Sequence, residues 1–368
     1  MVECNRCGNT EAKYFVWLNG QAQCRRCISY QGNEGESLVY TGKIEEELSF
    51  DLSQKQKEVS SRILEYACLG DVLVHAICGA GKTELVLETI SFYLNQGKKV
   101  GIAVARRQVV LQLAPRYQAI YPQLKVIPVC EGHTQDLTGH LIISTTHQLF
   151  RYPQHFDLLI LDEPDAFPFK QDVVLQGFAQ KACRGHTLYL TATPDITLRH
   201  RVQTHTLKEV TLYRRPHQYD LPVPKLRFLP LLGQILALKL WLNQQPKPVL
   251  IFVPTIKLGQ QLKTVLKIPF VHARDLDLDM RVSDFKQGKI MQLICTSVLE
   301  RGVTFENVQV VMIEANHPIY DLAALIQIAG RVGRSVQYPT GEVFFYASGL
   351  SQEMVQCLNQ IEIANHSV

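Results

Sequence analysis

Short apolar runs rich in Val, Ile and Leu alternate along most of this chain with longer amphipathic stretches. An apolar run of roughly 4–8 residues is typical of a buried strand, and a longer stretch with a helical period is typical of a helix. The first series of predicted strands lies at residues 72–77, 100–104, 141–144, 158–161 and 188–190. Strands that alternate with helices form parallel sheets, so we expect an α/β fold here.

A second series of the same kind follows a proline-rich stretch at residues 214–230. Proline lacks a backbone donor and restricts the residue before it, so we expect no regular element in that stretch and place the main domain boundary there. Beyond it the pattern predicts strands and helices in alternation. The predicted strands are residues 249–253, 293–296, 308–313 and 342–346, and the predicted helices include 256–266 and 322–330.

Length and composition agree with several folded parts. A chain of 368 residues exceeds one ordinary core, and 46% hydrophobic with 20% charged residues is typical of a folded protein. We expect three parts, at residues 1–36, 37–215 and 216–368. No apolar run approaches the ~20 residues that cross a bilayer, and the N-terminus has no secretory signal, so a cytoplasmic protein is expected.

The net charge of +4 is mild and neither demands nor excludes a polyanionic partner. Basic pairs such as Arg25-Arg26, Arg106-Arg107 and Arg214-Arg215 are, taken alone, typical of solvated surface.

Two C-x2-C pairs stand in the first 30 residues, formed by Cys4 with Cys7 and Cys24 with Cys27. Their spacing matches a structural zinc site, because four thiolates leave no open coordination position for catalysis. Gly8 permits the tight turn after the first pair. The alternative is four buried free thiols. The basic residues of this module suit phosphates, although a protein-docking ribbon fits equally well; they are Arg6, Lys13, Arg25 and Arg26.

A phosphate-binding loop follows the strand at 72–77, in the sequence Ala76-Ile-Cys-Gly-Ala-Gly-Lys82-Thr83. Residues 84–95 behind it have a helical pattern, which gives the strand, loop and helix that such a loop requires. The glycines let backbone amides approach the phosphates, Lys82 reaches the outer phosphates, and Thr83 holds Mg²⁺.

An apolar strand at 156–161 ends in Asp162 and Glu163. Two acids at a strand end are often a solvated turn. After a phosphate-binding loop, however, they suit phosphoryl transfer, with Asp162 on the magnesium ion and Glu163 orienting the attacking water. We expect the nearby His75, Cys78 and Cys130 to be packing residues.

These motifs resemble the superfamily 2 helicases, and within them the ComFA family of late competence proteins. The resemblance covers nearly the whole chain and rests on segments in family order. They are Leu52-Ser-Gln-Lys-Gln56, Ala105-Arg106-Arg107, Thr145-Thr146-His147, Asp162-Glu-Pro-Asp-Ala-Phe-Pro168, Thr191-Ala192-Thr193, residues 249–254 and 296–305, and Gln327-Ile-Ala-Gly-Arg331-Val-Gly-Arg334. Pro164 stands where ComFA proteins typically have Val, and both carboxylates remain.

The resemblance implies two tandem RecA-like lobes after the four-cysteine zinc module. It implies that Arg331 and Arg334 act as arginine fingers on the γ-phosphate. The ATP-binding set it implies is Gln56, Gly79, Ala80, Gly81, Lys82, Thr83 and Glu84, and the DNA-binding set is Arg106, Arg107, Thr145, Thr255 and Thr296. Contacts of the latter kind touch backbone phosphates and do not read sequence.

Three functions fit these features. The first is an ATP-dependent translocase on single-stranded DNA that helps a competent bacterium take up transforming DNA, with Mg²⁺ and structural Zn²⁺ as cofactors. Its implied partners are the membrane DNA-uptake channel, other competence proteins and a second copy of the chain, and its location is cytoplasmic, with a peripheral position at the inner face of the membrane left open. The others are a duplex-unwinding helicase of repair or replication restart, and a zinc-dependent scaffold with a relic ATP site.

Overall fold

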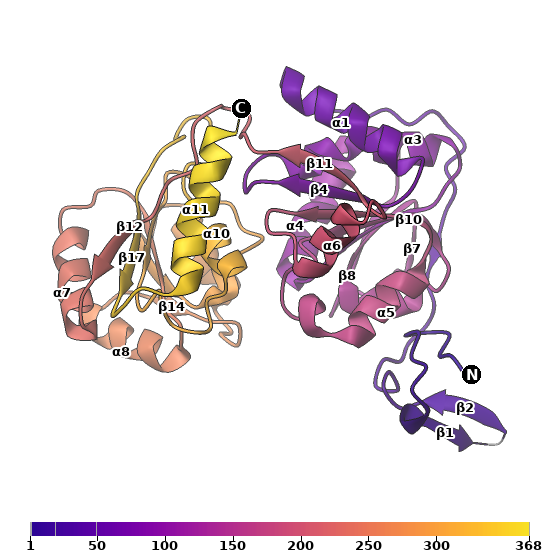
Figure 1. The fold of residues 1–368 in the computed structure, drawn as a ribbon, viewed down its shortest axis with the longest axis horizontal. Coiled ribbons are helices and arrows are strands. Elements are labelled where there is room, and N and C mark those ends of the chain that lie inside the picture. Colours follow the sequence, from indigo (N-terminus) through magenta and orange to yellow (C-terminus); the bar gives the residue numbers. More distant parts are fainter. Residues whose placement is uncertain (1, 19, 49, 368) are drawn as a thin grey trace. The chain divides into compact units, whose positions relative to one another are not determined.

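The computed structural model of the chain describes residues 2–18, 20–48 and 50–367. The fold has two compact units. The first comprises Met1–Ala76 and Gly81–Leu212, and the second comprises Ile77–Ala80 and Tyr213–Val368. Each unit is built around one parallel β-sheet, as Figure 1 shows.

The sheet of the first unit has the strand order β11-β4-β10-β9-β5-β8-β6 within the described ranges. Its strand pairings are parallel throughout. The strands are β4 Val72–Ala76, β5 Val100–Val104, β6 Val126–Val129, β8 Leu141–Thr145, β9 Phe156–Asp162, β10 Cys183–Thr191 and β11 Lys208–Leu212. The five strands predicted here all form, because continuous apolar runs are buried on both faces of a parallel sheet.

Helices connect these strands. They are α1 Gln54–Ala67, α2 Lys82–Leu85, α3 Leu87–Asn95, α4 Arg107–Ile120, α5 Val173–Ala182 and α6 Ile196–Gln203, with 3-10 turns η2 Thr146–Arg151 and η3 Phe169–Gln171. The single helix predicted at 84–95 is divided at Val86, which ends α2 with φ −101° and precedes α3. A two-stranded sheet pairs β3 Glu36–Ser37 with β7 Thr138–Gly139.

The four-cysteine module packs onto the first unit. Its turn η1 Ala12–Tyr14 leads into a hairpin of β1 Phe15–Leu18 and β2 Gln21–Cys24. Its cysteines belong to the same buried cluster as residues of β9, η2 and α5. The ring of Tyr30 contacts that of Phe178 of α5 edge-on at 4.8 Å, and Lys181 of α5 pairs with Glu3 at 2.5 Å. The module is therefore part of the first unit's core.

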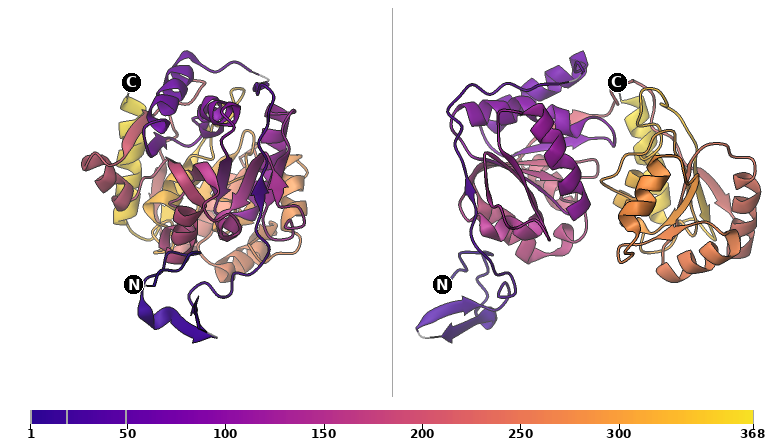
Figure 2. Two further views of the ribbon diagram at one scale, coloured as in Figure 1. Left: turned by 90° about the vertical axis from the view of Figure 1, so that its right-hand side faces the viewer. Right: turned by 180° about the vertical axis from the view of Figure 1, so that it is seen from behind.

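The second unit has a sheet of order β12-β17-β16-β13-β15-β14 in the part of the chain that is described, again with parallel pairings. Helices cover both faces (Figure 2). The strands are β12 Lys225–Phe228, β13 Val249–Phe252, β14 Phe270–Val271, β15 Gln292–Cys295, β16 Gln309–Met312 and β17 Val343–Ala347. The helices are α7 Leu231–Leu242, α8 Ile256–Leu266, α9 Leu278–Lys286, α10 Leu322–Ala329 and α11 Gln352–His366, with the 3-10 turn η4 Ser297–Leu299.

The expectation that prolines break every element between 214 and 230 is wrong. Strand β12 forms there at the edge of the sheet and pairs with β17. Pro224 directly precedes the strand and Pro230 is the N-cap of α7, so neither removes a donor from the ladder itself. No helix in the described ranges is long and apolar enough to cross a membrane.

Candidate functional site

The phosphate-binding loop connects β4 to α2 in the conformation that its glycines allow. Gly79 and Gly81 have φ of 84° and 86°, a region that residues with a Cβ rarely adopt. Gly81 is the N-cap of α2, and a Cβ there would lie 2.6 Å from Nε2 of Gln56. Backbone amides at the start of α2 can therefore approach an anion closely, and the helix N-terminus favours its charge.

The predicted carboxylates lie at the same edge of the sheet. In the order β4-β10-β9, parallel pairing sets Leu190 opposite Asp162 and Thr191 opposite His75. Glu163 follows β9 with φ 54° and donates its backbone N–H to the carbonyl of Leu190 at 2.8 Å. The strand ends thus bring the acidic pair beside the phosphate loop.

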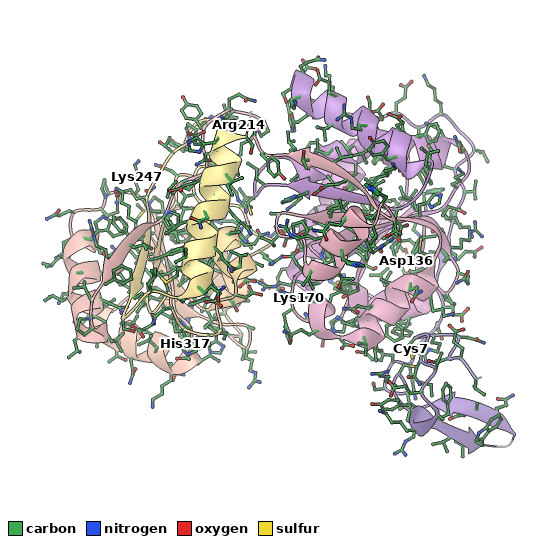
Figure 3. All side chains as sticks on the ribbon, in the orientation of Figure 1. Cys7, Asp136, Lys170, Arg214, Lys247 and His317 are labelled. Carbon is green, nitrogen blue, oxygen red and sulfur yellow. The ribbon has the colours of Figure 1, made fainter. Side chains whose placement is uncertain are left out.

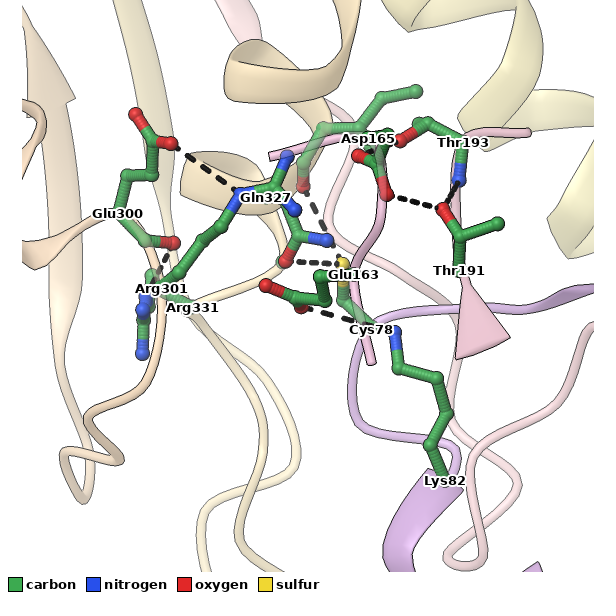
Figure 4. Close-up of polar contacts among 12 residues, drawn as sticks. Cys78, Lys82, Glu163, Asp165, Thr191, Thr193, Glu300, Arg301, Gln327 and Arg331 are labelled. Carbon is green, nitrogen blue, oxygen red and sulfur yellow. Dashed lines mark hydrogen bonds and ion pairs between the residues drawn. The ribbon is translucent and has the colours of Figure 1, made fainter. Parts of the chain in front are cut away.

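Lys82 and Glu163 are brought together directly. Nζ of Lys82 lies 3.9 Å from Oε1 of Glu163, and both side chains are largely buried (Figure 4). The lysine ammonium and the carboxylate thus face each other beside the phosphate-binding loop. Thr83, predicted as the magnesium ligand, is half-buried in the first turn of α2.

Asp165 is a site residue to which the sequence assigned no role. Its two carboxylate oxygens accept hydrogen bonds from the hydroxyls of Thr191 at 2.6 Å and Thr193 at 2.8 Å, and all three residues are buried (Figure 4). The Thr193 backbone N–H also donates to the Thr191 hydroxyl at 2.9 Å. This network joins the loop after β9 to the end of β10. The sequence contained one indication of this contact: the segments 162–168 and 191–193 are both motifs of the same family and occur in the family's order.

Gln56 and Glu84 are both buried beside Gly81 of the phosphate-binding loop. Gln56 completes a capping box with Ser53 at the start of α1. Glu84 pairs with Arg116 of α4, which the sequence did not single out. A hollow of about 400 Å³ lies beside this pair; it is lined by Glu47, Leu48, Phe50, Glu84, Arg116, Ala119 and Ile120. A cavity of that size is in the range of small-molecule sites.

Tyr117 of α4 is a buried ionisable group close to Asp162 and Glu84. Burial raises the pKa of the Tyr117 phenol well above its ordinary value, and the charges of Tyr121, Asp162 and Glu84 add to the effect. Tyr117 therefore stays neutral near pH 7 and serves packing.

In the second unit, Arg331 is almost fully buried. Its Nε donates to the carbonyl of Glu300 at 3.1 Å, and its Nη1 donates to the carbonyl of Val303. Arg334 is half-buried and donates from Nε to the carbonyl of Gly330 at 2.8 Å. Arg331 thus orders the loop after η4, and a role for either residue as an arginine finger stays a prediction.

Arg215 corrects the expectation that its basic pair is solvated surface. The side chain is 1% exposed and donates to the carbonyls of Val332 at 2.7 Å, Gly333 at 2.6 Å and Gly330 at 3.0 Å. Burial, and then the charge of Arg334, lowers the pKa of Arg215 to about 10, so it remains protonated near pH 7. It holds the turn that carries both predicted fingers.

The four cysteine sulfurs lie within 4.8 Å of one another, and all four residues are buried. Sγ of Cys4 is 3.7 Å from that of Cys27, and Sγ of Cys7 is 3.7 Å from that of Cys24. A tetrahedral zinc ion with Zn–S bonds of about 2.3 Å requires sulfurs about 3.8 Å apart, so the residues fit this ion. Burial raises the pKa of Cys7 to about 11 and also raises that of Cys27. Gly8 takes the left-handed φ of 68° expected for the turn.

The residues predicted to contact DNA lie at the carboxyl ends of strands in each unit. In the first, β5 pairs with β8, with Val104 opposite Thr145, and Arg106 and Arg107 follow directly. Nε of Arg107 donates to the carbonyl of Glu131 at 2.9 Å. In the second, Thr255 caps α8 and Thr296 precedes η4, after the paired strands β13 and β15. Their contacts with DNA stay predictions.

Two family models match the chain. Residues 49–196 match the model described as the res subunit of type III restriction enzymes, and residues 230–336 match the helicase conserved C-terminal domain. The chain in the structure "S. cerevisiae Dbp5 bound to RNA and ADP BeF3" is 17% identical. It superposes with a TM-score of 0.64 over 86% of this chain and 92% of that one, which shows the same fold. Both units are therefore RecA-like lobes.

Two curated relatives are similar over almost the full length. Competence protein ComFA of Bacillus subtilis is 34% identical over 98% of this chain and 85% of its own. Competence protein ComFA of Streptococcus pneumoniae is 34% identical over 98% of this chain and 90% of its own. With the phosphate loop, the acidic pair and both RecA-like lobes present, the chain belongs to the ComFA family of superfamily 2 helicase-type, DNA-dependent ATPases.

Proposed function

We propose that the protein is an ATP-dependent translocase on single-stranded DNA that helps drive the uptake of transforming DNA. The observation that carries the proposal is the placement of Lys82 against Glu163, 3.9 Å apart, beside a glycine-rich loop at the edge of the first sheet. Membership of the ComFA family, whose characterised members are named as competence proteins, supplies the biological setting.

In this proposal ATP binds with its phosphates on the amides of the loop that ends at Lys82. Thr83 and Asp162 hold Mg²⁺, which neutralises charge on the phosphates, and Glu163 orients the attacking water. Gln56, which is buried next to Gly81 of the loop, and the hollow beside Glu84 take the base end of the nucleotide. Lys82 moves from Glu163 to the outer phosphates when the nucleotide binds.

Asp165 transmits changes at the nucleotide in the same proposal. Its two threonine hydrogen bonds tie the loop after β9 to the end of β10, so a shift of Glu163 moves both segments together. Arg331 and Arg334 stabilise the developing charge, and Arg215 fixes their turn. Since Arg331 is buried, Arg334 offers the cleaner kinetic variant.

DNA contacts are proposed at the strand ends that carry Arg106, Arg107, Thr145, Thr255 and Thr296. Donors of this type hold backbone phosphates, so binding is expected to weaken with salt and to depend little on sequence. Zn²⁺ on the four cysteines is proposed as a structural cofactor that stabilises the module. The proposed location is cytoplasmic, peripheral at the inner face of the membrane, with the uptake channel, other competence proteins and a second copy of the chain as partners.

The test is ATP hydrolysis by the full chain with single-stranded DNA, duplex DNA or RNA. Single-stranded DNA is expected to raise turnover most. Lys82→Ala and Glu163→Gln are each expected to lower kcat by roughly a hundredfold or more, because each removes a group needed in the transition state. The exposed Lys57→Ala and Glu65→Gln on α1 are matched controls expected to keep wild-type turnover.

Unchanged turnover in both site variants would refute the motor, and no hydrolysis by the wild-type chain would favour a scaffold with a relic site. Strand separation by the protein alone would favour the duplex-unwinding helicase over the translocase.

A further inference from the structure

Helix α7 of the second unit is apolar on the side that faces solvent. Its sequence is LLGQILALKLWL, and its inner side packs Leu238 and Leu242 into the core of the unit. At 100° per residue the opposite side presents Leu232, Leu236 and Leu240, together with Lys239. These leucines are 82%, 60% and 59% exposed. A stripe of three exposed leucines along about 12 Å of one helix is more than the scattered apolar residues of an ordinary surface.

Helix α8 lies on the same side of the sheet as α7. Both helices contribute to one buried cluster with Val249 and Ile251 of β13, whose side chains share a face. The outer side of α8 presents Lys257 and Lys263, both exposed. We call the exposed residues Leu232, Leu236, Lys239, Leu240, Lys257 and Lys263 the α7–α8 face.

The segment of sequence that contains both helices is one-sided in charge. Residues 221–274 contain eight Lys or Arg and no Asp or Glu, whereas a stretch of this length holds about five acidic residues at the chain's overall composition. Of these eight, Lys225 alone has an ion pair among the described residues, with Glu342. Lys247 is exposed on the loop between α7 and β13, where Figure 3 labels it.

We infer that the α7–α8 face docks the protein on the surface of an anionic lipid bilayer. Exposed leucines reach the boundary of the acyl chains, and the surrounding lysines meet the negative headgroups. With 12 residues, α7 is too short to span a bilayer and lies along it. This inference gives the proposed membrane location a defined surface and rests on that part of the proposed function.

The composition of the face favours lipid over the other polyanions and over protein. Protein interfaces are enriched in aromatic residues and Arg and depleted in Lys, and Leu is under-represented among their energetic centres. Grooves for single-stranded nucleic acid combine cations with aromatic stacking platforms. The exposed residues of α7 and α8 are mainly Leu and Lys, together with uncharged polar residues such as Gln260 and Thr264. A bilayer accepts such a surface because it demands no shape complementarity.

The experiment measures flotation of the full chain with vesicles, without nucleotide or DNA. Vesicles of phosphatidylglycerol mixed with phosphatidylcholine are expected to bind the wild-type protein, less so as salt is raised, and vesicles of phosphatidylcholine alone are expected to bind weakly. Leu232→Gln with Leu236→Gln, and separately Lys239→Glu with Lys263→Glu, are each expected to lower the partition constant by roughly tenfold or more.

A matched control changes exposed leucines of the same unit outside the face. Leu276→Gln with Leu350→Gln, at side chains 101% and 58% exposed, is expected to bind like the wild type. The inference is overturned if wild-type protein does not prefer anionic vesicles, or if either α7–α8 double variant binds them as the control does. It is also overturned if the leucine variant changes oligomeric state or DNA binding in place of vesicle binding. ATP hydrolysis of each variant is expected to match wild type, so loss of vesicle binding and loss of the motor are separate results.

Discussion

Gly177, in the middle of α5, is where the backbone of the four-cysteine module lies against this helix. A Cβ at this position would lie 2.0 Å from the carbonyl oxygen and 2.8 Å from the carbonyl carbon of Cys7. Both are backbone atoms, so no change of side-chain rotamer can relieve the overlap. The variant Gly177→Ala must therefore push the module and α5 apart.

Two effects of opposite sign compete in Gly177→Ala. Alanine in a helix interior is normally better than glycine by about 1 kcal/mol. Against this, overpacking of a filled core costs about 1–3 kcal/mol, and separation also weakens the Tyr30–Phe178 ring contact and the Lys181–Glu3 pair. Since real Cβ contacts below 3.0 Å are essentially absent, a shift of this size cannot be absorbed locally. We expect the free energy of unfolding to fall by about 1–3 kcal/mol.

The assay is urea unfolding of the full chain, with amide hydrogen exchange to locate the change. Gly233→Ala in α7 is the matched control, because a Cβ there meets only side-chain atoms, those of Leu229 at 3.3 Å and Pro230 at 3.7 Å. The control is expected to be neutral or stabilised by up to about 1 kcal/mol. Exchange in α5 and around the cysteines is expected to accelerate in Gly177→Ala alone. A Gly177→Ala protein as stable as the control, with unchanged exchange, would refute the packing of module on helix.

Three further predictions concern buried polar groups. Asp165→Ala leaves two buried threonine hydroxyls without their acceptor, so urea unfolding is expected to show a loss of about 2–4 kcal/mol; a loss below about 1 kcal/mol would contradict the network. Arg215→Met removes the hydrogen bonds to four carbonyls, those of Cys78, Val332, Gly333 and Gly330, and is expected to lose about 3 kcal/mol in the same assay. Arg214→Met, at a more exposed side chain, is expected to lose less than about 1 kcal/mol. Burial, then the charges of Lys99 and Arg184, lowers the pKa of His155 to about 4, and its Nε2 accepts the Ser37 backbone N–H at 2.6 Å. Between pH 6.5 and 4 the unfolded chain therefore binds more protons than the folded protein. The free energy of unfolding is expected to fall by about 2 kcal/mol, after solvent screening, as the pH drops through that window. His155→Gln is expected to flatten this part of the stability profile, and an unchanged slope would contradict it.

Features that depend on neighbours in sequence were predicted well. Apolar runs in the sequence predict the buried strands. The glycines of the phosphate-binding loop take the left-handed φ that their positions require. The four cysteines come together because each C-x2-C pair is local and one hairpin joins the pairs. The local sequence pattern alone is enough to determine the structure of such features.

Features that depend on distant partners were missed or wrong. Arg215 looks like half of an ordinary basic pair, and only the folded second unit supplies the carbonyls near residue 330 that bury it. Arg116 likewise has a structural role only because it pairs with Glu84, which is 32 residues away in sequence. Strand β12 was excluded because of flanking prolines, although an edge strand needs only four residues between them. No local pattern encodes these partners.

The partners of charged residues are also hard to predict from the sequence alone. Three of the four basic residues in the cysteine module are engaged within the protein. Arg6 lies over the ring of Phe150, Lys13 pairs with Glu11 at 2.6 Å, and Arg26 pairs with the same carboxylate at 3.0 Å. Phosphate binding by the module would compete with these contacts, and both alternatives, phosphate binding and protein docking, stay predictions.

The net charge of +4 is therefore a poor guide to the partners of this protein. Eight of the 38 basic residues and none of the 34 acidic ones fall within residues 221–274, so the remainder of the chain is acidic overall. Electrostatic attraction to a surface decays within about one Debye length, roughly 8–10 Å, and it depends on the charges that face the surface and not on the total. A chain that is nearly balanced as a whole can hence bind an anionic bilayer through the basic segment of its second lobe.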